Sequence, residues 1–177
     1  MPNTHKTLIH TALYPEAKPL IQYFNLVQNK SYEPLKIFEN NQYILVVSGM
    51  GQVKTTDALV FVFEIFNINK AVNIGIAGCI DKRIKLGSLF CTNHSLPNIQ
   101  TASLTTVDEP LEDASLLKTL LVDMEAKSFV QCARKNLNKE NVFVFKIVSD
   151  YLSKEIPDKS LVYNSIKKSI PKWENVI

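Results

Sequence analysis

The segment AVNIGIAG, residues 71–78, is an apolar run punctuated by glycine. A second run, VFVFKIV at 142–148, consists almost entirely of β-branched and aromatic residues. Strands that are apolar throughout, rather than at alternate positions, are typical of sheets covered by helices on both faces. These two segments therefore predict an α/β layered fold with a largely covered central sheet.

Outward from these segments, strand patterns alternate with helix patterns, without a linker or a repeat. The pattern predicts further strands at 7–13, 35–38, 43–47 and 89–92, and helices after Tyr14-Pro15-Glu16 and at about 53–66, 122–137 and 160–170. The last helix is expected to end at Pro171, because proline cannot donate the next helical hydrogen bond. We expect a single domain over residues 1–177.

The helix at 53–66 has apolar side chains at close to helical spacing. Its apolar face is predicted to carry Val53, Thr56, Val60, Phe63 and Phe66.

The composition excludes several classes of protein. The chain has 177 residues, of which 46% are hydrophobic and 21% charged. This balance excludes a disordered segment, a collagen-like repeat and a disulfide scaffold. The net charge is only +3 and the basic residues are scattered, so we expect no nucleic-acid partner. The most apolar stretch, 58–66, is interrupted by Glu64 and is too short for a membrane span, so we expect no membrane partner.

The cysteines and histidines suggest neither disulfides nor a metal site. Cys79, Cys91 and Cys132 have no CxxC spacing and are expected to be buried thiols in a reducing compartment. The three histidines are too dispersed for a zinc pattern. The polar N-terminal residues lead into no apolar run of the signal-peptide type. We therefore expect a cytoplasmic protein without metal or cofactor.

All five glycines lie between residues 49 and 87. Two pairs, Gly49 with Gly51 and Gly75 with Gly78, fall at the ends of predicted strands. Glycine allows a tight turn there and lets a ligand approach the main chain. A turn that binds nothing would explain one such pair. Two pairs in succession favour a pocket beyond the carboxyl ends of the strands.

Three acids, Glu16, Glu125 and Asp150, follow apolar strands and would point toward that pocket. Asp150 ends the most apolar strand, so we expect it at a desolvated edge of the sheet. Each acid also has a purely structural explanation. Glu16 and Glu125 could be first-turn helix charges, and Asp150 could be a cap or turn residue.

Five elements, in order along the chain, resemble the sequence motifs of the nucleoside phosphorylase and nucleosidase superfamily. They are ALYPEA at 12–17, VSGMGQVK at 47–54, NIGIAG at 73–78 with IKLGS at 84–88, VDMEA at 122–126 and IVSD at 147–150. The first is similar to the A-M-x-x-E segment of the methylthioadenosine/S-adenosylhomocysteine nucleosidase branch. The resemblance implies a three-layer fold with a mixed central sheet flanked by helices, and cleavage of the N-glycosidic bond of a purine nucleoside.

The resemblance also implies roles for the three acids. Asp150 would be the general acid that protonates the purine, and Glu16 would activate the attacking water. Glu125 would hold the ribose hydroxyls, and Met124 would pack against the sugar, although filling the core is an alternative role for Met124. The other residues that the resemblance places at the substrate are Gly49, Ile76, Ala77, Gly78 and Ser149.

The choice between water and phosphate as nucleophile is argued from charge. A phosphorylase normally binds its dianion with arginines and backbone amides. Where the phosphorylase branch has an arginine and a hydroxyl residue, this chain has Asn73 and Ile76. Hydrolysis of a purine nucleoside or a 5′-thio-nucleoside is therefore expected. A phosphorylase that takes its cations from elsewhere, or an inactive nucleoside-binding member, are the alternatives.

The chain also departs from the family. The insert before the M-E element is short, residues 96–113 contain no aromatic residue, and Lys146 replaces an arginine. Residues 107–111 are expected to occupy the segment that contacts the base. The resemblance further implies a homodimer, for which the apolar helix at 53–66 offers a face, unless that helix is packed on both sides within one chain.

Overall fold

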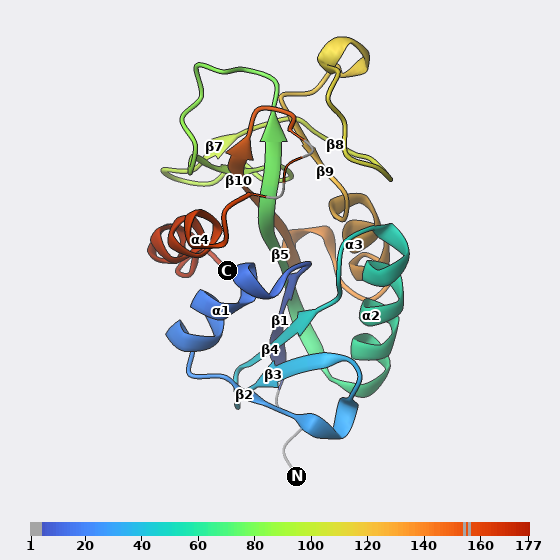
Figure 1. Cartoon of the computed structure of the whole chain (residues 1–177). Coiled ribbons are helices and arrows are strands. Elements are labelled where there is room, and N and C mark those ends of the chain that lie inside the picture. The colour runs from blue at the N-terminus through green and yellow to red at the C-terminus, as the bar shows by residue number, and fades with distance from the viewer. Residues whose placement is uncertain (1–4, 154, 156) are drawn as a thin grey trace.

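The computed structural model describes residues 5–153, 155 and 157–177. Within them, ten strands form one mixed sheet (Figure 1). The strands are β1 (Lys6–Thr11), β2 (Val27–Gln28), β3 (Lys36–Glu39), β4 (Tyr43–Val47), β5 (Ile68–Cys79), β6 (Leu89–Cys91), β7 (Gln100–Thr101), β8 (Leu104–Thr106), β9 (Leu121–Asp123) and β10 (Val142–Asp150). The helices are α1 (Tyr14–Tyr23), α2 (Gln52–Ile65), α3 (Ala126–Ala133) and α4 (Lys159–Trp173), with single 3₁₀ turns at η1 (Lys30–Tyr32), η2 (Ala114–Leu116) and η3 (Lys139–Asn141).

The order of strands places β5 at the centre of the sheet. The main path runs β2-β3-β4-β1-β5-β10-β6-β7. In it, β4, β1, β5 and β10 are parallel neighbours. The C-terminal end of β5 also pairs with β9, and β9 pairs with β8. The ends of β5 and β10 therefore meet at one edge, where Asp150 pairs with Gly78.

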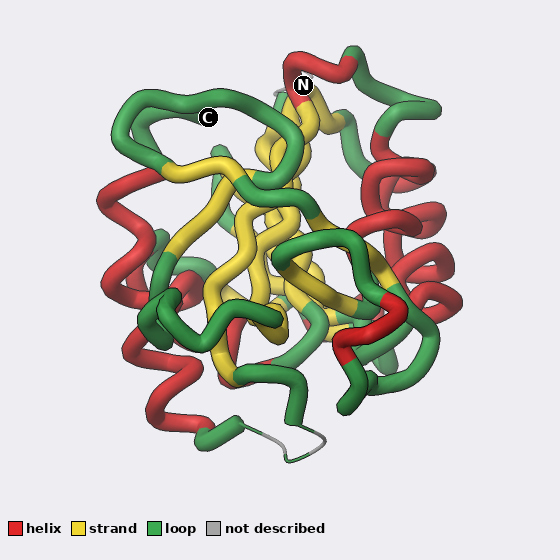
Figure 2. Tube along the Cα trace, turned by 90° about the horizontal axis from the view of Figure 1, so that it is seen from above, coloured by secondary structure: helices red, strands yellow, loops and turns green. Residues whose placement is uncertain are grey.

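Helices cover both faces of this sheet, as Figures 1 and 2 show. On one face, Leu20 of α1 and Ile166 of α4 are fully buried in a cluster with residues of the central strands. On the other face, Leu59 of α2 and Phe129 of α3 are buried in a second cluster. The predicted α/β class, with a mixed and covered central sheet, is confirmed. None of the helices in the described part of the chain combines the length and apolar character needed to cross a membrane.

The predicted apolar face of α2 was wrong in part, since Phe63 and Phe66 do pack against the second cluster. The side chains that α2 buries are Thr55, Ala58, Leu59 and Val62. Val53 and Val60, assigned to that face, are 74% and 47% exposed. Two of the four buried side chains, Thr55 and Ala58, are small or polar, so a search for large apolar residues does not find this face.

Two further boundaries differ from the prediction. Residues 121–123 form β9 rather than the start of a helix, because Val122 pairs with Gly78 of β5. Pro171 lies inside α4, which continues to Trp173. Proline removes only one hydrogen bond so near the helix end. The fully buried indole of Trp173 stacks on Phe145, with ring centroids 5.5 Å apart, and holds the last turn in place.

This packing makes Trp173→Ala a severe change. Removing a fully buried aromatic side chain leaves a cavity, and the free energy of unfolding should fall by about 3–5 kcal/mol in a urea titration. Val27→Ala, at a side chain that is 71% exposed, is the matched control and should change it by less than about 0.5 kcal/mol. Equal effects of the two substitutions would contradict the assigned core.

Candidate active site

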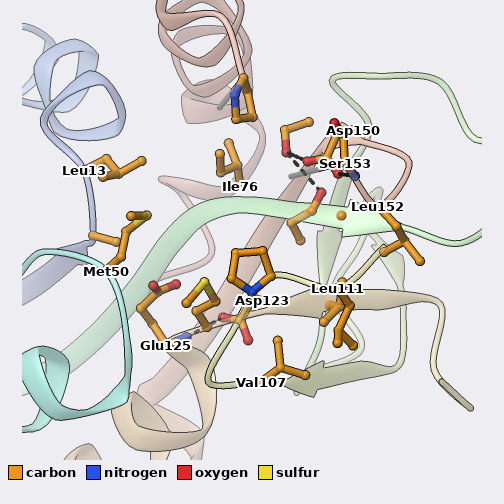
Figure 3. A pocket seen from close by; sticks show the side chains of 18 of the residues that line it. Leu13, Met50, Ile76, Val107, Leu111, Asp123, Glu125, Asp150, Leu152 and Ser153 are labelled. Atoms are coloured by element: carbon orange, nitrogen blue, oxygen red, sulfur yellow. Dashed lines mark hydrogen bonds between the residues drawn. The ribbon is translucent and has the colours of Figure 1, made fainter. Parts of the chain in front are cut away.

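A cavity opens beyond the carboxyl ends of β5 and β10 (Figure 3). Its wall is formed by the start of α1, Met50 after β4, the end of β5, residues 107–111, the segment 122–125, and the end of β10 with the residues that follow it. Glu16, Glu125 and Asp150 all line this cavity, although they lie far apart in the sequence. The structure thus brings the three candidate acids to one site.

Glu16 is held by the main chain. It lies in the first turn of α1 and is only 2% exposed. Its Oε2 accepts hydrogen bonds from the N–H groups of Ala12 (3.0 Å) and Leu13 (2.8 Å). Its Oε1 accepts one from the N–H of Ile76 (3.0 Å). Burial raises the pKa of Glu16 to about 7, against the effect of these N–H groups, so the carboxyl can exchange a proton near neutral pH.

Gly75 makes room for this carboxyl group. A Cβ atom at that position would lie 2.9 Å from Glu16 Oε1 and 3.6 Å from Lys146 Nζ. Gly75 does not have a positive φ, so its role is close approach rather than a turn. Gly78 acts in the same way, since a Cβ atom there would lie 3.2 Å from Asp150 Oδ1.

Glu125 lies at the start of α3 and is buried. Its Oε1 accepts a hydrogen bond from the N–H of Gly51 at the start of α2 (3.0 Å). Burial raises the pKa of this carboxyl group, against the nearby charge of Lys146. The contact with Gly51 fixes the carboxylate at the cavity wall, between two helix N-termini.

Asp150 is the last residue of β10 and lies at the opposite end of the cavity from Glu125 (Figure 3). Its Oδ2 accepts a hydrogen bond from the hydroxyl of Ser149 (2.6 Å), and its Oδ1 accepts one from the N–H of Ser153 (3.0 Å). The expectation of a desolvated position was wrong, because the residue is only partly buried. Its carboxyl group belongs to a residue that lines the cavity, so a ligand bound there can contact it.

A buried ion pair lies behind Glu16 and Glu125. Lys146 Nζ is 2.7 Å from Asp123 Oδ2, and the two side chains are 1% and 0% exposed. Asp123 also accepts hydrogen bonds from Thr106 Oγ1 (2.6 Å) and the N–H of Ala126 (2.8 Å). Sequence reasoning did not predict this pair. The signal was present, since a lysine within an otherwise apolar strand requires a buried anion as partner.

The remaining predicted site residues divide into two groups. Those that line the cavity are Ile76, Ala77, Gly78, Met124 and Ser149. Gly49 does not line it. It adopts a φ of +89° in the turn before Met50, which does.

The shortened segment at 107–111 also reaches the cavity, with Val107, Pro110 and Leu111 at its wall.

No model of a known protein family matches the chain, and no curated protein sequence matches it either. Solved structures do. Futalosine hydrolase of Helicobacter pylori superposes with a TM-score of 0.81 at 16% identity, covering 98% of this chain and 99% of that one. An H. pylori nucleosidase variant with 5′-methylthioadenosine in its active site gives 0.81 at 14% identity, covering 98% and 99%. The chain has the nucleoside-phosphorylase-like fold.

A third example of this fold is the 5′-methylthioadenosine/S-adenosylhomocysteine nucleosidase of Colwellia psychrerythraea in complex with adenine. It superposes with a TM-score of 0.73 at 19% identity, covering 92% of this chain and 89% of that one. The nucleoside-phosphorylase-like architecture is thus kept at an identity too low for sequence comparison.

The raised pKa of Glu16 predicts how stability depends on pH. Between the usual value of 4.5 and about 7, the folded state binds more protons than the unfolded state. Glu16 by itself should therefore make the free energy of unfolding fall as pH rises through this window, by up to about 1.4 kcal/mol per pH unit. His10, whose pKa burial lowers to about 3, contributes a slope of the opposite sign. Glu16→Gln removes only the slope due to Glu16. Urea titrations of the wild type and Glu16→Gln at several pH values from 4.5 to 7 measure the free energy of unfolding of each. If the two plots of this free energy against pH are parallel, the raised pKa of Glu16 is contradicted.

Proposed function

We propose that the protein hydrolyses the N-glycosidic bond of a purine nucleoside or a 5′-thio-nucleoside. The observation that carries the proposal is the convergence of Glu16, Glu125 and Asp150 on one cavity, in different environments. Glu16 is buried with a pKa of about 7, whereas Asp150 is only partly buried. Carboxyl groups in unlike environments can take different roles in one reaction.

In the proposed reaction, Asp150 donates a proton to a ring nitrogen of the purine. The bond between the base and C1′ of the ribose then breaks, and its electron pair stays with the protonated base. The hydroxyl of Ser149 and the N–H of Ser153 bind the two oxygens of Asp150. They orient the carboxyl group and stabilise the carboxylate that remains after transfer.

Glu16 acts on the other reactant. Its carboxylate takes a proton from a water molecule as the water oxygen bonds to C1′. The products are the free base and the free sugar. Three main-chain N–H groups fix the carboxylate of Glu16, so it is already oriented before the substrate binds. Glu125 accepts hydrogen bonds from the ribose hydroxyls, and Met124 packs against the sugar ring.

The charge at the cavity favours water over phosphate as the nucleophile. Among the described residues that line it there is no lysine or arginine. The nearest buried cation, Lys146, is already paired with Asp123. A phosphate dianion would be repelled by the carboxyl groups there, since Asp123 and Glu155 line the cavity together with the three candidate acids.

The apolar part of the cavity wall supports the proposed class of substrate. Val107, Pro110, Leu111 and Leu152 all line the cavity, and three of them, Val107, Leu111 and Leu152, are labelled in Figure 3. Such a surface suits a flat base or an apolar 5′ substituent. The similar structures include a nucleosidase with 5′-methylthioadenosine and one with adenine bound, which supports the same class of ligand.

A panel of nucleosides in phosphate-free buffer tests the proposal. Release of free base together with free sugar is the expected result, measured by chromatography. Cleavage that depends strictly on phosphate would instead identify a phosphorylase. Binding of adenine without cleavage of any nucleoside would identify a nucleoside-binding protein.

Asp150→Asn tests the general acid. The amide keeps the size of the side chain but cannot deliver a proton, so turnover should fall by about 10²–10⁴-fold, with little change in unfolding free energy. Asp113→Asn is the control, because Asp113 caps η2 and does not line the cavity, and its turnover should equal that of the wild type. Normal cleavage by the Asp150→Asn variant would remove Asp150 from the mechanism.

We further propose that the protein is a homodimer through the exposed face of α2. Val53 and Val60 lie two turns apart on this face and are both exposed. Met50, which precedes α2, is 52% exposed and also lines the cavity. A second copy seated on this face would cover the apolar side chains and close one side of the cavity.

Light scattering at micromolar concentration tests the dimer. The wild type should have the mass of two chains, and Val53→Asp should have the mass of one, because the substitution places a charge in the interface. Val27→Asp, on the exposed edge strand β2, should remain dimeric. A monomeric wild type would refute the proposal.

The cytoplasm is the location that we propose. Cys79, Cys91 and Cys132 are free and buried, which fits a compartment that keeps thiols reduced.

A further inference from the structure

Lys146 is a buried lysine within an otherwise largely apolar strand. It lies in the middle of β10, between Phe145 and Ile147, and is 1% exposed. Bringing an ammonium group into such a place costs several kilocalories per mole unless anions compensate it. One anion, Asp123, is in direct contact at 2.7 Å. A buried ion pair is weak evidence for a role in stability, because the desolvation of both charges opposes their attraction.

Several ionisable groups face the ammonium group from the surrounding elements. Asp123 comes from β9, Glu125 from the start of α3, and Glu16 from α1, and each interacts with the charge of Lys146. His10 of β1 also interacts with it. Burial lowers the pKa of His10 to about 3, so this imidazole is neutral. The charge of one buried lysine therefore interacts with three buried carboxyl groups.

The geometry at Gly75 brings Lys146 close to Glu16. The position of a Cβ atom on Gly75 is 2.9 Å from Glu16 Oε1 and 3.6 Å from Lys146 Nζ. The carboxyl and ammonium groups therefore occupy the space beside the same Cα atom. Asp123 is itself anchored by Thr106 and by the N–H of Ala126, so it fixes the ammonium group at this place.

We propose that Lys146 is a positioning residue for the hydrolysis, which allows Glu16 and Glu125 to carry negative charge together behind the substrate, with Asp123 as its anchor. The inference rests on the proposed function and assigns to the buried pair a role in it. Lys146 does not line the cavity and acts through the two carboxylates. Its charge favours the ionised form of Glu16, the form that can accept a proton from water.

The variants must separate this role from a structural one. Lys146→Met alone would leave Asp123 buried without a partner, and the chain could fail to fold. The double variant Lys146→Met/Asp123→Asn removes both charges and leaves no buried ion behind. Lys146→Gln removes the charge and keeps a hydrogen-bond donor for Asp123. Lys146→Arg keeps the charge. Lys6→Met is the control, because Lys6 forms an ion pair with Glu39 (2.6 Å) away from the cavity.

Two measurements are made on each variant. The first is the titration of the Glu16 carboxyl carbon by ¹³C NMR in the free protein, assigned with Glu16→Gln. The second is kcat/KM for the cleaved nucleoside as a function of pH. The midpoint of Glu16 should rise by about one pH unit or more in the double variant and in Lys146→Gln. The apparent pKa of the acid limb of the kcat/KM profile should rise by the same amount. Lys146→Arg and Lys6→Met should leave both close to wild type.

An unchanged Glu16 midpoint in the folded double variant or in Lys146→Gln would overturn the inference and leave the lysine a structural partner of Asp123. The NMR titration needs no substrate. If the wild type cleaves no nucleoside, the proposed function fails, while the titration still decides whether Lys146 controls the charge of Glu16.

Discussion

Carboxyl groups crowd against the main chain of β5, and this close approach is the constraint on which the site depends. Gly75 and Gly78 leave space that a side chain would fill, one beside Glu16 and the other beside Asp150. β5 is also the strand that joins β1, β10 and β9. The parallel pairings bring elements from both ends of the sequence to the same edge of the sheet. A side chain on either glycine would push a carboxyl group away from the geometry that these pairings create.

The site is costly in free energy, and the two apolar layers offset that cost. Glu16 and Glu125 are buried with raised pKa values, which means that burial disfavours their charged forms. Such local instability is common at functional sites, where the rest of the fold must compensate for it. Here the compensation comes from α1 and α4 on one face and α2 and α3 on the other. Lys146 is itself buried, and its charge interacts favourably with those of Asp123, Glu125 and Glu16.

The features that could be predicted from the sequence are those set by local pattern. β10 and the central part of β5 are continuous apolar runs, and Glu16, Glu125 and Asp150 stand in recognisable motifs near strand ends. The failures have long-range causes. The buried face of α2 includes the polar Thr55 and the small Ala58, which the spacing of large apolar residues does not reveal. The short strand β9 exists because it pairs with β5, and its own three residues are too few to indicate it. The pairing of Asp123 with Lys146 has the same kind of cause, because many acids in the chain could be the partner of a lysine in an apolar strand, and only the tertiary structure selects one.

The start of α2 links the parts of the site that the local motifs treat separately. The N–H of Gly51 binds Glu125. The side chain of Gln52 donates to Asp108 (2.7 Å), in the segment at 107–111, and accepts from Ser128 of α3 (3.0 Å). One helix end therefore fixes both a carboxylate of the site and the short segment that forms part of its wall. The short insert needs this support, because residues 107–111 form no strand or helix of their own. The exposed valines lie on the same helix, so any contact made there bears directly on the element that holds the site together.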